Sequence, residues 1–249
     1  MIKKIKFKIK RFIDYRVRLL RDQQHQNQQI NFDYNQLSHL FKEDSFIPFS
    51  AWAISPSTIL HVLNDISINK RNRIIEFGSG ASTFYIAKLI KTLKLKASFY
   101  SVESDKEWAN ELESLLKLYE ISDFVRVIYA PLSTVPNEYK LKEQSVWYDV
   151  NKLDEALKDD AKFDLVLVDG PFGGSTPYAR YSAIPYLKSL LSKNASIYLD
   201  DTNRKDEKEI IVQWLKILGF DRFDFERYSC LKPSQNFDVS PFQLSKPGI

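Results

Sequence analysis

Beyond residue 70, the apolar residues fall into short, nearly continuous runs separated by amphipathic stretches. Such runs predict buried strands, because strands covered on both faces lose the alternation of apolar and polar positions. FDLVLVD is the most continuous run and therefore predicts a central parallel strand. The five predicted strands are RIIEF (73–77), ASFYSVE (97–103), FVRVIYA (124–130), FDLVLVD (163–169) and ASIYLD (195–200).

The stretches between these strands carry apolar residues at helical spacing. Asp105 can cap the second helix and Gly219 can end the last one. Pro185 lies inside the third and predicts a kink or a break, since proline lacks the N–H that a helix interior uses. The predicted helices are STFYIAKLIKTL (82–93), DKEWANELESLLKLY (105–119), PYARYSAIPYLKSLL (177–191) and KDEKEIIVQWLKILG (205–219).

Strands that alternate with helices predict an α/β domain with a parallel sheet and right-handed crossovers. Two later runs, FDFERYS (223–229) and FDVSPFQLS (237–245), predict an antiparallel pair at the end of the chain. Residues 131–162 interrupt the alternation and form a longer insertion. Ser55 and Pro56 can cap and open a helix over TILHVLNDI, so we divide the chain into an extension and cap, 1–54, and a main domain, 55–249.

The first thirty residues are strongly basic and place apolar residues along one helical face, namely Ile2, Ile5, Ile9, Phe12 and Ile13. Two interpretations of such a helix compete. It can be a solvated helix whose apolar stripe packs on the main domain or on another subunit, or a basic amphipathic helix lying on an anionic membrane face. The alternation of Lys and Ile at the very start also suits a strand.

Composition narrows the class of protein only slightly. Hydrophobic residues make up 44% of the 249 residues and charged residues 27%, as in ordinary globular proteins. The net charge of +4 comes from the basic start, so we expect no nucleic-acid partner for the main domain. Cys230 is the single cysteine, which excludes an intramolecular disulfide and indicates a reducing compartment such as the cytoplasm. No apolar run has the length of a transmembrane helix, and none has the pattern of a signal peptide.

The strongest chemical signal is the segment RIIEFGSGASTFYIAKLI, in which a strand runs through Glu76 into Gly78, Ser79 and Gly80 and then into a helix. Glycines suit a tight turn that a ligand approaches closely, and the helix N-terminus offers free N–H groups to a negative group. The second strand ends at Glu103, where a carboxylate can accept from two ribose hydroxyls. Alternatively, the glycines only form a turn and Glu103 only caps a helix. The occurrence of both features in this order favours a ribose-containing ligand.

Electrostatics distinguish the possible ligands. The loop G-S-G-A-S-T has Thr83 where a dinucleotide fingerprint has its third small residue. Glu76 would repel a pyrophosphate, whereas it can receive the ammonium group of S-adenosylmethionine directly or through water. We therefore expect S-adenosylmethionine rather than NAD, with the cofactor held by this loop, including Ser82 and Thr83 at the start of the helix.

Three carboxylates follow neighbouring strands. Asp169 ends the fourth strand, and Asp200 and Asp201 follow the fifth. Because parallel strands bring their carboxyl ends together, the three can meet and could hold Mg²⁺, which would lower the pKa of an acceptor hydroxyl. Alternatively, these residues cap a helix and shape a turn. Without a metal, the candidates for a catalytic base are Asp169, Asp201 and His61, although His61 lies in an apolar helix and suits a structural role.

Several residues near these carboxylates are candidates for binding the acceptor. Gly173, Gly174 and Ser175 predict a flexible loop over the same edge of the sheet. The candidate acceptor ligands are Arg180 and Tyr181 after this loop, and Trp147 and Tyr148 in the insertion, whose rings could stack on an acceptor. Packing around long loops explains these four residues equally well.

The chain resembles the class I S-adenosylmethionine-dependent methyltransferases over about residues 55–230. The resemblance rests on EFGSGAST (76–83), SVES (101–104), YAPL (129–132), LVDGP (167–171) and YLDD (198–201). It implies a Rossmann-like three-layer sandwich with a mostly parallel seven-stranded sheet and an antiparallel C-terminal strand. It further implies that Glu76, Gly78 and Gly80 hold the methionine end, that Glu103 holds the ribose, that Ala130 lies beside the adenine and that Asp169 lies near the sulfonium and the acceptor.

The sequence also departs from some members of that family. It lacks the Asn/Asp-Pro-Pro-Tyr tetrad of amino-group methyltransferases and has Asp169-Gly170-Pro171 in its place. It also has no cysteine where cytosine C5 enzymes carry theirs. By elimination, we expect O-methylation of a small molecule or a sugar. The rival hypotheses are a ligand-binding scaffold without activity and an NAD-dependent oxidoreductase on the same fold.

Overall fold

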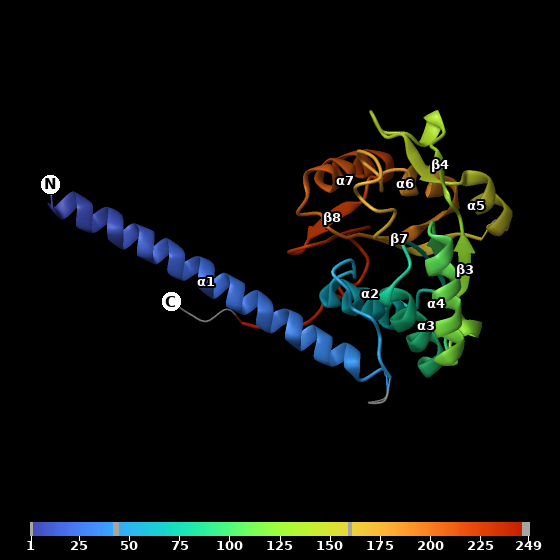
Figure 1. The fold of residues 1–249 in the computed structure, drawn as a ribbon, viewed down its shortest axis with the longest axis horizontal. Helices are drawn as coiled ribbons and strands as arrows, with labels where there is room; N and C mark the ends of the chain where they lie inside the picture. The colour runs from blue at the N-terminus through green and yellow to red at the C-terminus, as the bar shows by residue number, and fades with distance from the viewer. Residues whose placement is uncertain (1, 42–44, 159–160, 246–249) are drawn as a thin grey trace.

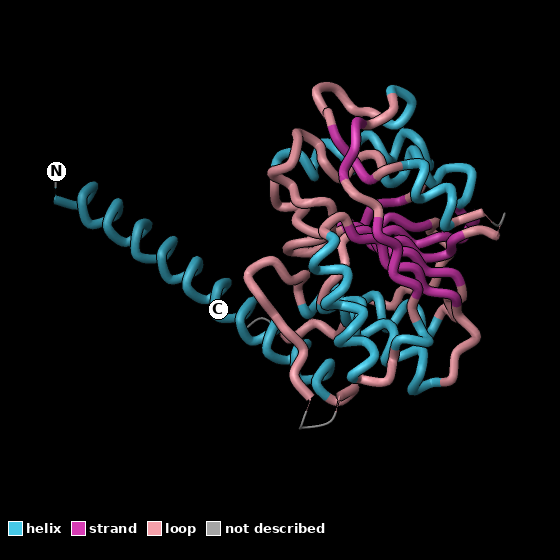
Figure 2. Tube along the Cα trace, turned by 45° about the vertical axis from the view of Figure 1, so that its right-hand side comes forward, coloured by secondary structure: helices cyan, strands magenta, loops and turns pink. Residues whose placement is uncertain are grey.

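The computed structural model of the chain describes residues 2–41, 45–158 and 161–245, and within them it shows a sheet sandwiched between two layers of helices (Figures 1 and 2). The helices and short 3-10 turns are α1 (Ile2–Ser38), α2 (Pro56–Ile68), α3 (Ala81–Leu93), α4 (Lys106–Leu118), η1 (Ser122–Phe124), η2 (Asn137–Tyr139), α5 (Val150–Ala156), α6 (Ala183–Leu187), η3 (Lys188–Leu190) and α7 (Lys205–Leu218). The strands are β1 (Arg73–Phe77), β2 (Ser98–Glu103), β3 (Arg126–Tyr129), β4 (Leu132–Thr134), β5 (Val146–Tyr148), β6 (Phe163–Val168), β7 (Leu191–Leu199), β8 (Asp221–Asp224) and β9 (Ser229–Lys232).

The main sheet has seven strands in the order β3-β2-β1-β6-β7-β9-β8. The first five strands in this order, β3, β2, β1, β6 and β7, are parallel, and β9 runs antiparallel to both of its neighbours, β7 and β8. This confirms the predicted fold class. The order reverses at β1, because β2 lies on one side of it and β6 on the other, and open α/β sheets bind ligands at such a reversal.

Each face of the sheet has its own apolar core. On one face, β1 contributes Ile74, which packs with the buried sides of α2, α3 and α4. On the other face, Ile75 and Phe77 of the same strand pack with α6, α7 and the inserted strand β5. All five residues of β1 are buried, so its apolar residues Ile74, Ile75 and Phe77 do not alternate with exposed polar ones.

The predicted helix ends are confirmed in three places. Ser55 caps α2 by accepting a hydrogen bond from the Thr58 N–H at 3.1 Å, and Pro56 is the first residue of the helix. Asp105 caps α4 by accepting from the Trp108 N–H at 2.9 Å. Gly219 ends α7 with a positive φ of 64°, which a residue without a Cβ adopts at little cost.

The predicted helix over 177–191 is largely wrong. Residues 177–182 form turns, α6 covers only Ala183–Leu187, and β7 already begins at Leu191. Pro185 is the third residue of α6, where its missing N–H would have no partner within the helix, so it neither kinks nor divides the helix. The preceding turn instead directs Arg180 toward the carboxylates of the sheet edge.

The predicted terminal pair is only half right. β8 pairs with β9, but the second strand is Ser229–Lys232 and not 237–245. Residues 237–245 are irregular and run beside α1: Gln29 Nε2 donates to the Phe242 carbonyl at 2.9 Å, and the Leu244 N–H donates to Gln29 Oε1 at 2.8 Å. Their backbone groups therefore pair with a helix side chain rather than with the sheet.

The N-terminal segment is a single helix of 37 residues, so the alternative of a strand at its start is wrong. The insertion at 131–162 holds the hairpin of β4 and β5 and the short helix α5. Among the described residues, no helix combines the length and the apolar character needed to cross a bilayer.

Candidate functional site

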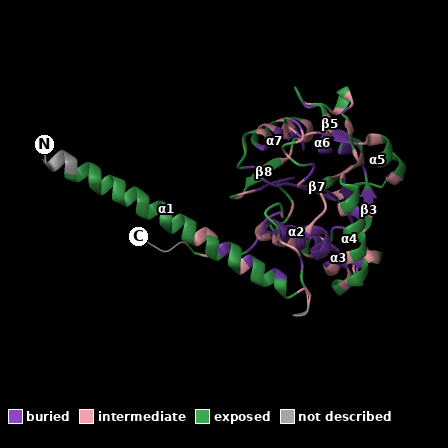
Figure 3. Ribbon diagram, in the orientation of Figure 1, coloured by how far each residue is buried: buried purple, intermediate pink, exposed green. Residues whose placement is uncertain are grey.

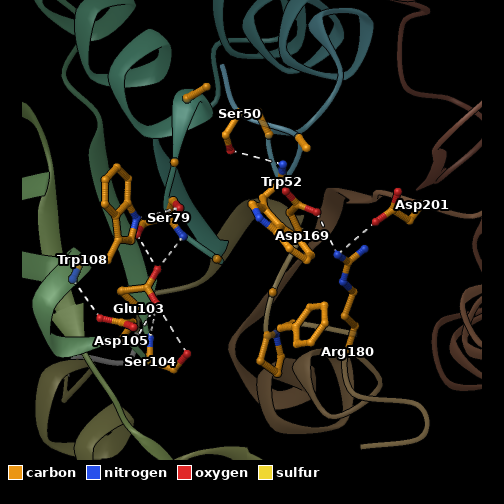
Figure 4. Close-up of a pocket in the computed structure, with 18 of the residues that line it drawn as sticks. Ser50, Trp52, Ser79, Glu103, Ser104, Asp105, Trp108, Asp169, Arg180 and Asp201 are labelled. Atoms are coloured by element: carbon orange, nitrogen blue, oxygen red, sulfur yellow. Dashed lines mark hydrogen bonds and ion pairs between the residues drawn. The ribbon is translucent and has the colours of Figure 1, made fainter. Parts of the chain in front are cut away.

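A cavity of about 720 Å³ opens at the carboxyl ends of β1, β2, β6 and β7 (Figure 4). Loops that follow four strands and the segment before α2 converge on it. Its wall consists of Gly78, Ser79, Gly80, Ala81 and Phe84; Glu103, Ser104, Asp105 and Trp108; Pro48, Ser50, Ala51, Trp52 and Ala53; Tyr148; and Asp169, Gly170, Pro171, Phe172, Arg180, Asp201, Arg204 and Arg227.

The glycine loop packs directly against the loop that follows β6. Gly78 has a φ of 91°, and a Cβ placed on it would lie 2.6 Å from the Gly170 nitrogen. The Phe77 carbonyl accepts hydrogen bonds from the N–H groups of Asp169 at 2.9 Å and Gly170 at 2.6 Å. Gly78 is therefore required by the backbone itself, because the two loops could not approach each other with a side chain at this position.

Gly80 differs from Gly78 because nothing in the protein occupies the space that its side chain would take. No atom lies within 4 Å of a Cβ placed on it, although the residue forms part of the cavity wall. It also precedes α3, whose first N–H groups point toward the cavity end of the helix. The open space next to Gly80 is therefore available to a ligand.

We predict that the two glycines respond differently to alanine substitution. Gly78→Ala should lower the free energy of unfolding by at least about 2 kcal/mol, because it combines a positive φ with a backbone overlap. Gly80→Ala should cost less than about 1 kcal/mol in stability but weaken S-adenosylmethionine binding about tenfold, since its methyl group enters the cavity. Denaturant unfolding and calorimetric titration measure the two effects. Equal loss of stability in both variants would contradict this distinction.

Glu76 lies behind the loop and not on the cavity wall. It is fully buried and accepts hydrogen bonds from three hydroxyls: Ser82 at 2.8 Å, Ser101 at 2.6 Å and Thr83 at short range. Burial raises the pKa of Glu76 to about 7. Thr83 in turn accepts from the Gly80 N–H at 3.0 Å, so Glu76 connects β1, β2 and the start of α3 beneath the loop.

Glu103 lies on the wall at the end of β2, with both carboxylate oxygens engaged (Figure 4). One oxygen accepts from the Ser79 hydroxyl at 2.6 Å and from the Ser79 N–H at 3.3 Å. The other accepts from the N–H groups of Ser104 at 2.6 Å and Asp105 at 2.8 Å. Beside it, Trp108 Nε1 donates to the Ser79 carbonyl at 3.2 Å, which places an indole ring on the same wall. Glu103 thus joins the glycine loop to the second strand.

The remaining candidate residues divide into two groups. Tyr148 and Arg180 form part of the cavity wall together with Asp169 and Asp201. The others are not on the cavity wall: Ser82, Thr83, Ala130, Trp147, Tyr181 and Asp200. His61 is buried in α2, where its Nδ1 lies 2.9 Å from the Tyr228 hydroxyl, and burial lowers its pKa to about 4. This agrees with the structural role expected for His61.

The three aspartates do meet, as their positions after adjacent strands predicted. Within the described residues, Asp169, Asp200 and Asp201 each offer a carboxylate oxygen, and these oxygens lie within 4.8 Å of one another. Arg180 Nη2 lies between two of them, 2.9 Å from Asp169 Oδ1 and 3.2 Å from Asp201 Oδ2 (Figure 4). The buried cluster therefore contains a guanidinium in direct contact with two acids.

Two further arginines contact the aspartates of this cluster. Arg204 Nη1 lies 2.9 Å from Asp201 Oδ2. Arg227 Nε lies 3.1 Å from Asp201 Oδ1, and its Nη2 lies 3.3 Å from Asp200 Oδ2. Glu207 Oε1 lies 3.9 Å from Arg180 Nη1, so three guanidiniums face four carboxylates. The donor set alone would suit Mg²⁺, but Arg180 Nη2 already lies between Asp169 and Asp201, so the residues as arranged do not fit a divalent cation there.

Two carboxylates of the cluster have a pKa above the ordinary value of an aspartate. Burial raises the pKa of Asp169 well above its ordinary value, with Arg180 acting in the opposite direction. Burial likewise raises the pKa of Asp200 to about 6, against the charge of Arg227. A carboxylate whose pKa lies closer to neutrality is a better proton acceptor than an ordinary aspartate, and Asp169 lies on the cavity wall.

Sequence reasoning missed several residues of the cavity. Trp52 and Phe172 are exposed at 73% and 60%, and their rings make an edge contact with centroids 5.2 Å apart at the cavity wall. Arg204 and Arg227 were missed as well. Two positions in the sequence could have pointed to these residues. Phe172 directly precedes the Gly173–Gly174 pair, and Arg204 follows a few residues after the paired aspartates.

No protein-family model matches the sequence, and no curated protein matches it. Solved structures do match. An O-methyltransferase from Bacillus cereus in complex with S-adenosylhomocysteine aligns with a TM-score of 0.52 and 13% identity, over 74% of this chain and 84% of that one. A candidate caffeoyl-CoA O-methyltransferase from Staphylococcus aureus aligns with a TM-score of 0.51 and 14% identity, over 86% and 97%. The chain therefore has the Rossmann-like fold that these proteins have.

Proposed function

We propose that this protein is an S-adenosylmethionine-dependent methyltransferase that methylates an oxygen of a small molecule or sugar. The observation that carries the proposal is one continuous cavity with two chemically distinct ends. One end has the glycine loop and Glu103, and the other has Asp169, Asp201 and Arg180. Such a cavity can hold a methyl donor and an acceptor side by side, and the fold shared with O-methyltransferases supports this assignment.

The first end suits S-adenosylmethionine. The open space beside Gly80 lies at the start of α3, where the first N–H groups of the helix suit the methionine carboxylate. Glu103 would exchange its contact with the Ser79 hydroxyl for the two ribose hydroxyls. Trp108 offers an aromatic surface beside it for the adenine. Glu76 would act mainly by positioning the loop, through Ser82 and Thr83, and by its charge toward the ammonium group.

The second end suits an acceptor hydroxyl. Asp169 would accept the hydroxyl proton, and the acceptor oxygen would attack the methyl carbon as the bond from that carbon to sulfur breaks. The electron pair of the broken bond stays on sulfur, which gives the methyl ether and S-adenosylhomocysteine. Arg180 orients Asp169 through the 2.9 Å ion pair, while Trp52 and Phe172 offer aromatic surfaces for a ring of the acceptor.

We expect the reaction to proceed without Mg²⁺. The guanidinium of Arg180 lies between Asp169 and Asp201, where a divalent cation would otherwise bridge them. Turnover should therefore change by less than about twofold when EDTA is added or Mg²⁺ is supplied, since no step needs the ion. The measurement is turnover with and without EDTA or Mg²⁺, assayed with an acceptor that has been found by screening. Loss of activity with EDTA and its return with Mg²⁺ would show that the cation displaces the guanidinium.

Thermal shift with cofactors separates the proposal from its rivals. S-adenosylmethionine should raise the melting temperature and NAD should not, because ligand binding stabilises only the folded state that holds it. A rise with NAD alone would favour the oxidoreductase, and no rise with either would favour a scaffold.

The buried single cysteine, Cys230, supports the cytoplasm as the compartment in which the protein works.

A further inference from the structure

From residue 6 on, the first half of α1 extends away from the main domain and lies in solvent (Figures 1 and 3). Every described side chain between residues 6 and 24 is exposed. Large apolar side chains are among them: Phe12 is 64% exposed, Leu20 60%, Ile9 53% and Ile13 53%. An isolated exposed apolar residue is ordinary, but a row of them on one helix marks an interaction surface.

These four residues form an outward-facing apolar stripe. At about 100° per residue, Ile9, Phe12, Ile13 and Leu20 fall within roughly 100° of the helix circumference. The end of α1 contacts the main domain through Gln29, Asp33 and Leu37, which are buried. That contact side is turned about 120° from the centre of the stripe. The main domain therefore does not cover the stripe, and the interpretation that the stripe packs on it is wrong.

Basic side chains surround this stripe. Residues 1–22 contain nine Lys and Arg residues and only two acids, Asp14 and Asp22, whereas the whole chain has 36 basic and 32 acidic residues. The rest of the chain is consequently slightly acidic. Arg16 lies within the apolar arc, and its long aliphatic stem allows the guanidinium to reach water from there.

We propose that residues 6–21 of α1 dock on an anionic lipid bilayer, with the apolar stripe in the headgroup region and the basic side chains on the lipid phosphates. Charge complementarity favours this occupant. Pairing of two stripes from two copies would bring two strongly positive helices together, which repels them. A nucleic acid would neutralise the basic residues but leave the exposed Phe and Ile side chains in water. A bilayer with acidic headgroups can bury the apolar stripe and neutralise the basic side chains.

Flotation of the full chain with vesicles tests the proposal. We expect binding to vesicles of phosphatidylcholine with about one third phosphatidylglycerol, and at least about tenfold weaker binding to phosphatidylcholine alone. The triple variant Lys6→Glu, Lys10→Glu, Arg11→Glu should lose binding by more than about tenfold. A matched control reverses three exposed charges of the main domain, Lys96→Glu, Lys117→Glu and Lys216→Glu, and should bind like the unmodified protein.

A second variant separates docking from charge attraction alone. Ile9→Gln, Phe12→Gln, Ile13→Gln keeps the charge and uses a residue that favours helices, so circular dichroism should be unchanged. It should lose at least about tenfold in binding to the anionic vesicles, because stable attachment needs both signals. Unchanged binding of this variant, or equal binding of the main-domain control and the Lys6 triple variant, would overturn the proposal. So would a stable dimer or a nucleic-acid complex formed in place of vesicle binding.

Discussion

Glu103→Ala should weaken S-adenosylmethionine binding by more than about tenfold. The carboxylate lies on the cavity wall at the end of β2 and contacts Ser79 of the glycine loop. Hydrogen bonds from ribose hydroxyls to a charged acceptor contribute about 1.5–3 kcal/mol each, and about 1.4 kcal/mol corresponds to a tenfold change in affinity. Calorimetric titration with S-adenosylmethionine measures the change directly.

The variant needs controls because Glu103 also joins the loop to the strand. Removal of its contacts with Ser79, Ser104 and Asp105 should lower stability as well, which thermal unfolding of the free protein will reveal. Glu107→Ala removes an exposed acid of α4 that is not on the cavity wall, and its affinity should stay at the wild-type value. Wild-type affinity in Glu103→Ala would refute the ribose assignment.

Asp169→Asn should lower turnover by about a hundredfold to ten-thousandfold while cofactor affinity changes by less than about threefold. The range is that of losing a general base, since the amide has the size of the carboxylate but cannot take the proton. In the structure, Asp169 contacts Arg180 and faces the cavity, but it makes no contact with Ser79 or Glu103 at the other end. Steady-state turnover and separate titration of the cofactor distinguish the two effects.

The pH profile adds a second readout for Asp169. Only its ionised form accepts a proton, and burial raises the pKa of this carboxyl above its ordinary value. Wild-type turnover should therefore fall with decreasing pH already above the range of an ordinary aspartate, whereas the residual turnover of Asp169→Asn should lack this fall. An equal loss of turnover and cofactor affinity in the variant would move Asp169 from the acceptor to the cofactor.

The parts of the site that sequence reasoning found are those whose position follows from the strand order. Gly78, Gly80, Glu103 and Asp169 each follow or end a strand, so a correct list of parallel strands brings them to one edge of the sheet. The burial of β1 and β6 made those strands visible as mostly apolar runs. Local chemistry and topology point to the same residues here, which is why the sequence could predict that they lie together at one cavity.

Arg204 and Arg227 could not be found in this way, and neither could the contact of Arg180 with the aspartates. Arg180 is positioned by a turn that the sequence pattern indicated to be helix, because apolar residues at helical spacing continue through residues 177–191. Arg204 and Arg227 come from two other segments, and only the fold brings all three to Asp201. Charge pairing across distant segments leaves no spacing signal in one sequence, so three aspartates without visible partners resembled a metal site.

Binding of S-adenosylhomocysteine by the purified full chain is the most direct test of the account. We predict a calorimetric titration with a dissociation constant in the micromolar range or below, about −8 kcal/mol in binding free energy, and no such binding of NAD. The product is the right probe because it fills the glycine loop and the Glu103 side without requiring an acceptor. Absence of measurable binding would contradict the methyltransferase assignment and leave the cavity without its proposed cofactor.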